Sequence, residues 1–243
     1  MTPVGSIRSI HRYLVKSMAG DPLERAELGW HGIVGDRRFA FRRTSEAGGF
    51  PWLTASRLAT LVRYRPVAAA DVAKLEAADV QVTTPSGQSF ALASHELRDH
   101  LAGAFGAPVD LVHIDNGIFD DAPLSLISRQ SIEAIGTAVG AGIDARRFRP
   151  NLVIDAADGQ PYAEDAWVGR LLVLGSEPDA PVVSITQRDL RCVMINLDPD
   201  SAASDPRVLK AVGALRGAQA GVYATVVRAG SVRAGAAIHL EGG

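Results

Sequence analysis

Cys192 is the most reactive side chain in the sequence and the one cysteine among its 243 residues. Arg191 precedes it directly, and Arg188 lies four positions before it. Nearby positive charge favours the thiolate, which is the form of cysteine that attacks electrophiles and binds metals. Cys192 is therefore a candidate nucleophile or metal ligand, and a buried, inert cysteine is the alternative interpretation.

A second candidate is the pair Lys16 and Ser17, which is followed by a glycine at position 20. A lysine supplies a point charge, a hydroxyl supplies a donor, and a glycine lets the backbone approach a phosphate closely. No glycine run precedes Lys16, so the segment is not a P-loop. The pair predicts a phosphate contact, with a solvated surface lysine as the alternative.

A third segment combines glycines with charged residues. Gly32 and Gly35 allow a tight turn before a predicted strand. Arg37 begins that strand, and Asp36 either orients Arg37 or Arg38 or pairs with one of them at the surface. The segment predicts a positioned arginine, and a plain glycine turn that leads into a barrel strand is the alternative.

The segment 146–151 reads Arg-Arg-Phe-Arg-Pro-Asn and leads into an apolar strand. Arginines at such a point are costly unless they meet an anion or solvent. Glu164 and Asp165, a little further along, are possible structural partners. Taken with Cys192 and Lys16, these segments predict a thiolate beside a cationic pocket of phosphate size. Such a pocket suits a soft metal that is held by sulfur and carried by an anionic organic cofactor.

Short strands and a few helices must position these residues. Helices are expected to begin at Ser94, at Ser128 or Ser131, and at Asp205-Pro206. A hairpin is expected around residues 85–87. Because strand and helix do not alternate regularly, we expect a β-rich α+β chain built on barrels and not a Rossmann-type sheet. The expected strands are 4–10, 37–43, 50–54, 61–67, 80–84, 89–92, 108–114, 151–155, 168–174, 182–186, 193–197, 222–227 and 237–240.

Composition limits the class of protein. A hydrophobic content of 47% is sufficient for one large domain or two small ones. The formal net charge of −2 gives no general attraction to nucleic acid or anionic membranes. A single cysteine excludes an internal disulfide and suits a reducing compartment. No stretch approaches the ~20 apolar residues of a membrane span, and no secretory signal is recognisable. We therefore expect a cytoplasmic protein.

These segments, together with three more, resemble the MOSC family, named for the C-terminal domain of molybdenum cofactor sulfurase. The resemblance extends over nearly the whole chain. It implies an α+β fold in which a β-barrel-like domain of residues 1–115 packs on a MOSC β-barrel of residues 116–243 with a few helices. The matching segments are Tyr13–Ser17, Gly32–Phe39, Asp121–Ser128, Phe148–Val153, Tyr162–Trp167, Arg191–Cys192 and Gly221–Ala224.

The resemblance also implies a cofactor and its contacts. The cofactor is a molybdenum cofactor (Mo-molybdopterin), and the expected chemistry is independent of pyridoxal phosphate. Cys192 corresponds to the catalytic residue that binds the metal. Some of the family's motifs hold the phosphate of the pterin, and others line the rest of the cofactor. The phosphate contacts correspond to Lys16, Ser17 and Arg37, and the other cofactor contacts to Ser128, Arg149, Asn151 and Arg191.

Within the family the chain is similar to the amidoxime-reducing components, which reduce N-hydroxylated compounds. The implied activity is that of a molybdenum-dependent oxidoreductase acting on N-oxygenated small molecules. A single cysteine cannot hold an iron–sulfur cluster, so electrons are expected from a separate ferredoxin, flavoprotein or cytochrome b5-like protein. The sequence selects no proton donor among Glu164, Asp165, His11, His31 and His113.

The chain departs from the family pattern at two places. Leu14 replaces the proline of Tyr-Pro-Val-Lys-Ser, which alters backbone stiffness and not ligand chemistry. Residues 54–57 depart from a Thr-Gln-Arg-Glu type segment, so no role is assigned to this loop. Two alternative functions remain open. One is a sulfur-carrier or cofactor-handling protein with a persulfide on Cys192. The other is a cofactor-free protein of MOSC fold that binds another small molecule or a protein partner.

Overall fold

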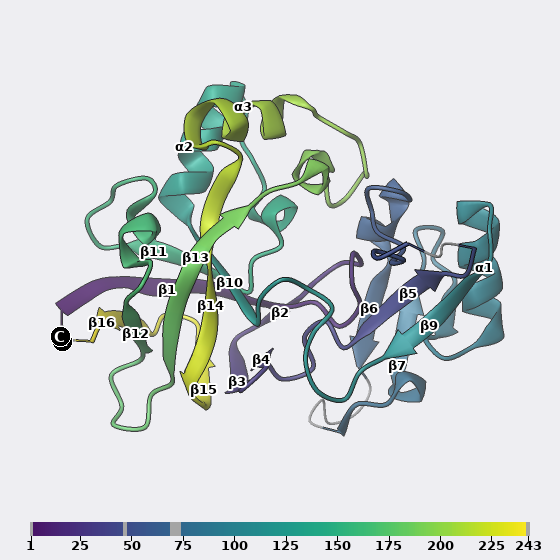
Figure 1. Ribbon diagram of the computed structural model, residues 1–243, viewed down its shortest axis with the longest axis horizontal. Helices are drawn as coiled ribbons and strands as arrows, with labels where there is room; N and C mark the ends of the chain where they lie inside the picture. Colours follow the sequence, from purple (N-terminus) through teal and green to yellow (C-terminus); the bar gives the residue numbers. More distant parts are fainter. Residues whose placement is uncertain (1, 46–47, 69–73, 242–243) are drawn as a thin grey trace.

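The computed structural model describes residues 2–45, 48–68 and 74–241. In these residues seven strands form a closed barrel, because β11 pairs with both β10 and β1 and so joins the two ends of the sheet. The order around the barrel is β11, β10, β14, β13, β12, β16 and β1 (Figure 1). The strands are β1 Thr2–Arg12, β10 Leu124–Ser128, β11 Leu152–Ala156, β12 Leu171–Leu174, β13 Val182–Leu190, β14 Gln219–Arg228 and β16 Ala237–Leu240.

The first strand of the chain closes this barrel. β1 pairs antiparallel with β11 and with β16, both of which lie far along the sequence. Ile7 and Ile10 of β1 are buried in the same core as Leu126, Ile154 and Ile185 of the barrel. Ile7 and Ile10 are three residues apart and would face opposite sides of a regular strand. A register shift between Ile7 and Ser9 in the pairing with β11 lets both side chains enter this core. The division between residues 115 and 116 therefore remains a proposal about domains, since β1 itself lies in the barrel.

Further short strands flank the barrel. β2 (Asp21–Leu23) extends the barrel sheet beside β1. β3 (Arg25–Gly29) pairs with both β4 (Gly32–Ile33) and β15 (Gly230–Arg233), and so joins an early segment of the chain to a late one.

Residues between β4 and β10 build a second unit, which lies beside the barrel in Figure 1. It contains the strand pair β5 and β9 and the antiparallel strands β6, β7 and β8, and α1 packs against them. Leu97 and Leu101 of α1 are fully buried in a core with Phe39, Phe41 and Val82. The elements are β5 Phe39–Arg43, β6 Arg65–Ala68, β7 Val80–Thr83, β8 Ser89–Ala91, α1 His95–Phe105 and β9 Val109–His113, with 3-10 turns η1 Ala59–Arg63 and η3 Ala77–Asp79.

The helices follow their sequence signals. Ser94 caps α1 and accepts a hydrogen bond from the backbone of Leu97, and a left-handed Gly106 ends the helix. Ser128 caps α2 (Arg129–Val139), which ends at a left-handed Gly140. α3 (Arg207–Arg216) begins one residue later than expected, with Pro206 in the cap position. Helices α2 and α3 pack together at one end of the barrel (Figure 1).

Three expected strands are wrong. Residues 193–197 form a 3-10 turn, η6 (Val193–Asn196), because tertiary partners take the polar groups of Asn196. Its carbonyl oxygen accepts from Arg147 at 2.7 Å, and its Oδ1 accepts from the backbone of Leu209 at 2.9 Å. Residues 50–54 contain a single bridge between Trp52 and Arg42, and residues 61–67 divide into η1 and β6. The remaining 3-10 turns are η4 Ala145–Phe148 and η5 Ala163–Trp167.

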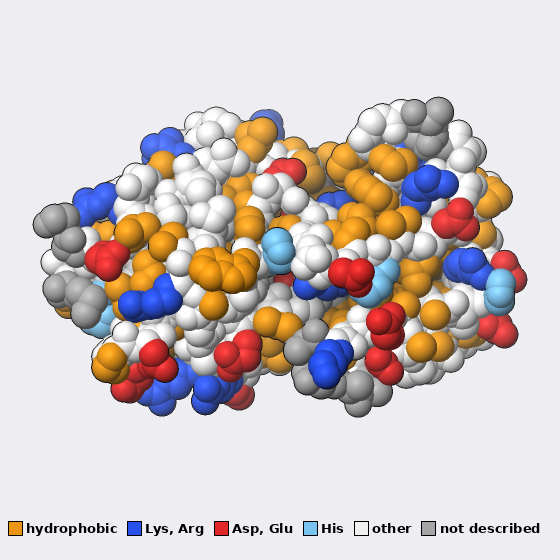
Figure 2. Space-filling view, turned by 60° about the horizontal axis from the view of Figure 1, so that its bottom comes forward, with side chains coloured by type: hydrophobic (Ala, Val, Ile, Leu, Met, Phe, Trp, Pro, Cys, Tyr) orange, Lys and Arg blue, Asp and Glu red, His pale blue; other side chains and the backbone are white. Residues whose placement is uncertain are grey.

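The surface mixes charges of both signs, as Figure 2 shows for one face. Acidic and basic side chains are interspersed there with hydrophobic ones, in agreement with a formal net charge of −2. In the part of the chain that the structure describes, no helix is long and apolar enough to cross a membrane.

We expect Leu101→Ala to lower the free energy of unfolding by about 2–5 kcal/mol, because it removes a fully buried side chain and leaves a cavity. Leu215→Ala is the matched control on α3, where the side chain is 47% exposed. Urea denaturation measures both variants. Equal losses would show that α1 does not anchor the second unit.

Candidate functional site

A cavity of about 370 Å³ lies between the barrel and the second unit, beside Cys192. We call it the cysteine cavity. Segments that are far apart in the sequence line it: the loop after β1, the turn before β5, the end of η4 and the turn from β13 into η6. The cavity brings together six of the predicted site residues, which are Lys16, Ser17, Arg37, Arg149, Arg191 and Cys192.

Cys192 is exposed and immediately precedes η6. The alternative of a buried, inert cysteine is therefore wrong for this structure. Arg191 fixes the backbone next to it, since its Nε donates to the carbonyl oxygen of Ala220 at 2.7 Å and its Nη1 donates to that of Phe148 at 2.8 Å. The sulfur atom is thus presented on a turn that hydrogen bonds from a buried arginine hold in place.

The two arginines near Cys192 do not act as free charges. Arg191 forms an ion pair with Asp189 at 2.7 Å, and Arg188 lies 3.4 Å from Asp165. Asp189 therefore balances the charge of Arg191, whereas Arg188 shares Asp165 with Arg216. This weakens the argument that Arg191 stabilises a thiolate. Arg191 acts here as a structural support of the cysteine turn.

Lys16 supplies a positive charge to the cavity. Its Nζ donates to the carbonyl oxygen of Phe119 at 2.6 Å and lies 5.8 Å from the ring centre of Phe50. Burial lowers the pKa of Lys16 below its ordinary value, and Asp120 opposes this change. The ammonium group keeps hydrogen-bonding capacity beyond its one bond to Phe119, since it has three donors.

Three lining residues have left-handed backbone conformations. The φ angles are 67° at Ser17, 48° at Arg37 and 51° at Arg149. Such angles are uncommon for residues other than glycine and cost on the order of 1 kcal/mol each. Strain of this kind concentrates at sites where the backbone must place particular groups. All three positions carry predicted cofactor contacts.

Arg37 is the centre of a buried hydrogen-bond network. Its guanidinium pairs with Asp36 and, at 2.7 Å, with Asp120. It also donates to Oδ1 of Asn151 at 3.2 Å and to the carbonyl oxygen of Arg149 at 2.9 Å. Most of its donors are therefore engaged within the protein. A phosphate would have to share Arg37 with Asp120, whereas Lys16 is more readily available.

Two predicted contacts lie outside the cavity lining. Asn151 is fully buried and connects Arg37 to the backbone of Ser125 at 3.1 Å and to that of His11 at 3.2 Å. Ser128 is fully buried at the start of α2, where its hydroxyl contacts Ser131. Neither Asn151 nor Ser128 lines the cavity, and their contacts with a cofactor stay predictions.

The cavity also contains residues that the sequence interpretation missed. Asp189 is almost fully buried, accepts from the hydroxyl of Ser125 at 3.0 Å and lines the cavity together with Tyr223. Burial raises the pKa of Asp189, and burial together with the charge of Asp189 raises the pKa of Tyr223. The sequence gives no signal that joins these residues, because they lie on different strands.

The loop that departs from the family pattern also reaches the cavity. Thr54 and Ser56 line it and hydrogen-bond each other at 2.7 Å. Phe50, which is 59% exposed, adds an aromatic ring to the same wall. Residues 54–57 therefore contribute hydroxyl groups to the cavity although their sequence departs from the usual motif.

The other candidate proton donors lie elsewhere. Glu164 is fully buried and accepts from the backbone of Ser128 at 3.1 Å, and Asp165 pairs with Arg216. His113 stacks on Phe39 with ring centres 4.5 Å apart. None of these residues, nor His11 or His31, lines the cysteine cavity. Among the described residues, no group of three or more His, Cys, Asp or Glu side chains is arranged to hold a metal ion.

Comparisons with known proteins point to one family. The model of the MOSC domain matches residues 97–239, which is more than half of the chain. The chain is 31% identical over 86 residues to mitochondrial amidoxime-reducing component 1 of Mus musculus and 37% identical over 91 residues to molybdenum cofactor sulfurase of Oryza sativa subsp. japonica. These matches cover 35% and 34% of this chain but only 23% and 10% of the relatives.

A solved structure has the same overall fold. The YuaD protein from Bacillus subtilis superposes with a TM-score of 0.52 and covers 97% of this chain and 94% of its own. Sequence identity is 14%, so this likeness concerns the fold alone. The expectation of a β-rich α+β chain with a MOSC barrel is confirmed.

We expect Arg37→Ala to lower the free energy of unfolding by about 3–5 kcal/mol, because it leaves the fully buried Asp36 without its charged partner. Arg38→Ala is the matched control, since that side chain is only partly buried and donates to the carbonyl oxygen of Gly117. Thermal or urea unfolding compares the two. A loss no larger than that of the control would contradict a central role for Arg37.

We expect Asp120→Asn to flatten the acid side of the stability profile. Burial alone would raise the pKa of Asp120, but the charges of Arg37 and Lys16 hold it below the ordinary value. Its contribution to stability is therefore fully present above the unfolded pKa of about 3.9 and is lost as the pH falls through the folded pKa. The wild type should lose more unfolding free energy than the variant between about pH 5 and pH 2.

Urea titrations at a series of pH values measure this difference. Asp99→Asn, an exposed carboxylate change on α1, is the control and should leave the profile unaltered. Parallel profiles for Asp120→Asn and the wild type would argue against the pairing of Asp120 with Arg37.

Proposed function

Because the chain belongs to the MOSC family, we propose that it binds a molybdenum cofactor in the cysteine cavity and reduces N-oxygenated small molecules with electrons from a separate protein. One observation carries this proposal. An exposed thiol and the donors of Lys16 and Ser17, which are about 175 residues apart in sequence, line a single cavity. The name of one relative, an amidoxime-reducing component, supports the reduction, and the name of the other, a molybdenum cofactor sulfurase, supports an association with the cofactor.

The residues present fit the cofactor. A thiolate is a soft ligand that suits molybdenum, and ammonium and hydroxyl groups suit a phosphate. Lys16, Ser17, Thr54 and Ser56 provide these donors on one side of the cavity, and Cys192 provides the sulfur. Asp120 disfavours an anion in the lining, but Arg37 pairs with it at 2.7 Å and balances its charge.

Different residues of the chain would then bind different parts of the cofactor and the substrate. Cys192 holds the metal, and Lys16 and Ser17 hold the phosphate. When bound, the metal supplies the two-electron chemistry that removes oxygen from an N–O bond. Phe50 and Leu190 line the cavity while 59% and 67% exposed, and they offer an apolar rim to the body of a substrate.

Reduction of an N-hydroxyl group to N–H also consumes two protons and releases water. Tyr223 lines the cavity near the buried carboxylate of Asp189, and its hydroxyl is suited to hold a proton there. Burial and the charge of Asp189 raise the pKa of Tyr223 and favour its protonated form, whereas the ion pair with Arg191 opposes protonation of Asp189. Tyr223 replaces Glu164, Asp165 and the histidines as the proposed proton source.

We expect Cys192→Ser to lose bound molybdenum and Lys16→Ala to lose cofactor by roughly 10- to 100-fold in affinity, since hydrogen bonds to charged groups contribute about 1.5–3 kcal/mol. Lys210→Ala, an exposed lysine on α3, is the matched control and should keep full occupancy. Elemental analysis measures molybdenum, and fluorescence of the oxidised pterin measures cofactor. Reduction of benzamidoxime with a chemical electron donor then tests the activity of the loaded protein.

Two outcomes of these measurements would indicate a different function for the protein. A mass increase of about 32 Da on Cys192, without bound metal or pterin, would indicate a sulfur carrier. Absence of metal, pterin and adduct from protein made in cells that synthesise the cofactor would indicate a cofactor-free binding protein. Both results would overturn the proposed oxidoreductase activity.

A further inference from the structure

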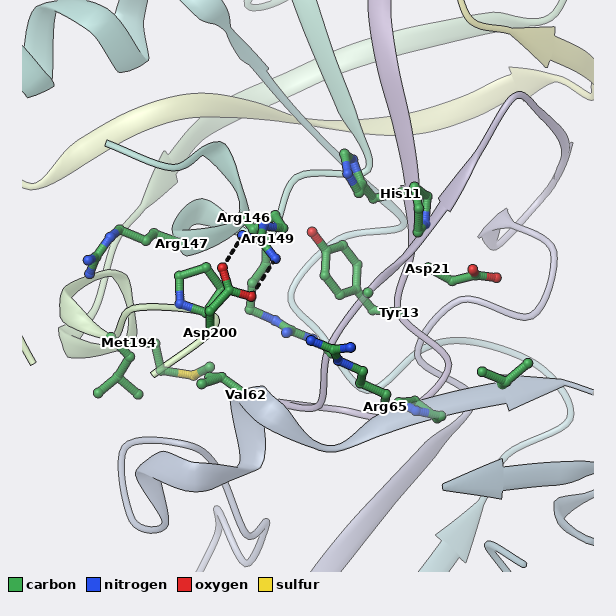
Figure 3. A pocket seen from close by; sticks show the side chains of 17 residues that line it. His11, Tyr13, Asp21, Val62, Arg65, Arg146, Arg147, Arg149, Met194 and Asp200 are labelled. Carbon is green, nitrogen blue, oxygen red and sulfur yellow. Dashed lines mark hydrogen bonds and ion pairs between the residues drawn. The ribbon is translucent and has the colours of Figure 1, made fainter. Parts of the chain in front are cut away.

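A second cavity, of about 410 Å³, lies on the other side of Arg149 from the cysteine cavity. We call it the tyrosine cavity, after Tyr13. It opens between the end of β1, the segment from η1 to β6, and the turns η4 and η6 (Figure 3). Arg147, Arg149 and Met194 border both cavities. None of the expected cofactor contacts except Arg149 lies in it.

Buried polar groups without partners gather at this cavity. The hydroxyl of Tyr13, Nη2 of Arg149 and Nδ1 of His11 are all buried and have no hydrogen-bond partner among the described residues. Tyr13 as a whole is 1% exposed. Nearly all buried polar groups in proteins are paired, and each unpaired one costs about 1–3 kcal/mol. Figure 3 shows Tyr13 in the middle of the lining, with the other two residues around it.

The charges at the cavity are unbalanced. Arg146 pairs with Asp200 at 2.6 Å, and Arg147 pairs with Asp198 at 3.1 Å. Arg65 and Arg149, by contrast, have no carboxylate partner in the described ranges of the chain. Burial lowers the pKa of Arg149 to about 10. A buried guanidinium without a counter-charge is unfavourable, and an anion would offset this cost.

The remaining wall is apolar. Val62, Pro66, Met194 and Leu197 contribute apolar side chains to the lining. A bare inorganic ion would leave these surfaces in contact with water. A ligand with an apolar body would bury them and gain about 25 cal/mol for each Å² removed from water.

We propose that the tyrosine cavity binds a small organic anion with an apolar body, whose oxyanion group lies against Tyr13, Arg65 and Arg149. The hydroxyl of Tyr13 and the two guanidinium groups donate to the oxyanion, and the apolar body packs against Val62 and Leu197. This site is separate from the proposed cofactor contacts at Lys16 and Cys192, and it does not require the cofactor.

Calorimetric titration of the purified 243-residue chain with benzoate tests the proposal. We expect saturable binding of benzoate and binding of acetate that is at least about tenfold weaker, because acetate lacks the apolar ring. Arg65→Ala should weaken benzoate binding about tenfold, and Tyr13→Phe about fivefold. Arg65 is exposed, so its variant is expected to fold, and melting curves check both variants.

Two controls locate the bound anion. Arg170→Ala, an exposed arginine outside both cavities, should leave binding unchanged. Lys16→Ala should also leave it unchanged, because Lys16 lines only the cysteine cavity. Absence of benzoate binding at millimolar concentration, or binding that is lost in Lys16→Ala and kept in Arg65→Ala, would overturn the proposal. Neither result depends on the molybdenum content of the protein, so the proposed function is tested separately.

Discussion

The buried guanidinium of Arg37 is the interaction on which the site depends. It pairs with Asp36 and Asp120, and it donates to Asn151 and to the backbone of Arg149. These partners belong to the turn before β5, the loop before β10 and the segment that leads into β11. A single side chain thus joins the N-terminal segments to the barrel. Burying these charges is costly, and the dense pairing is what makes the arrangement stable.

The same network explains why there are two cavities. Arg37 and Arg149 lie 4.8 and 4.2 Å from the ring centre of Tyr13, within the range of cation–π attraction. Arg149 is held on this ring and donates through Nη1 to the carbonyl oxygen of Met18 at 2.5 Å. Its side chain therefore stands between the cysteine cavity and the tyrosine cavity. The left-handed backbone at Arg37 and Arg149 shows that the fold accepts strain to place both guanidinium groups.

The structure also changes the roles of residues that a motif treats alike. Arg191, next to Cys192, supports the backbone of the cysteine turn and is balanced by Asp189. Lys16, much further away in sequence, supplies the charge that faces the cavity. Asn151 carries the Arg37 network into β11 and does not reach the cavity. A motif therefore identifies residues that belong to a site, whereas burial and pairing decide which of them can contact a ligand.

The sequence by itself determined the family, the β-rich α+β class and most of the regular elements. The caps Ser94 and Ser128 are local signals, because helix ends are set by neighbouring residues. Only the tertiary structure decided that residues 193–197 form a turn, since Arg147 donates to the carbonyl oxygen of Asn196 and the backbone of Leu209 donates to its Oδ1. It also decided that β1 closes the barrel and that Asp189 meets Tyr223 across two strands. Contacts between distant segments depend on packing and long-range pairing, which no local pattern of residues records.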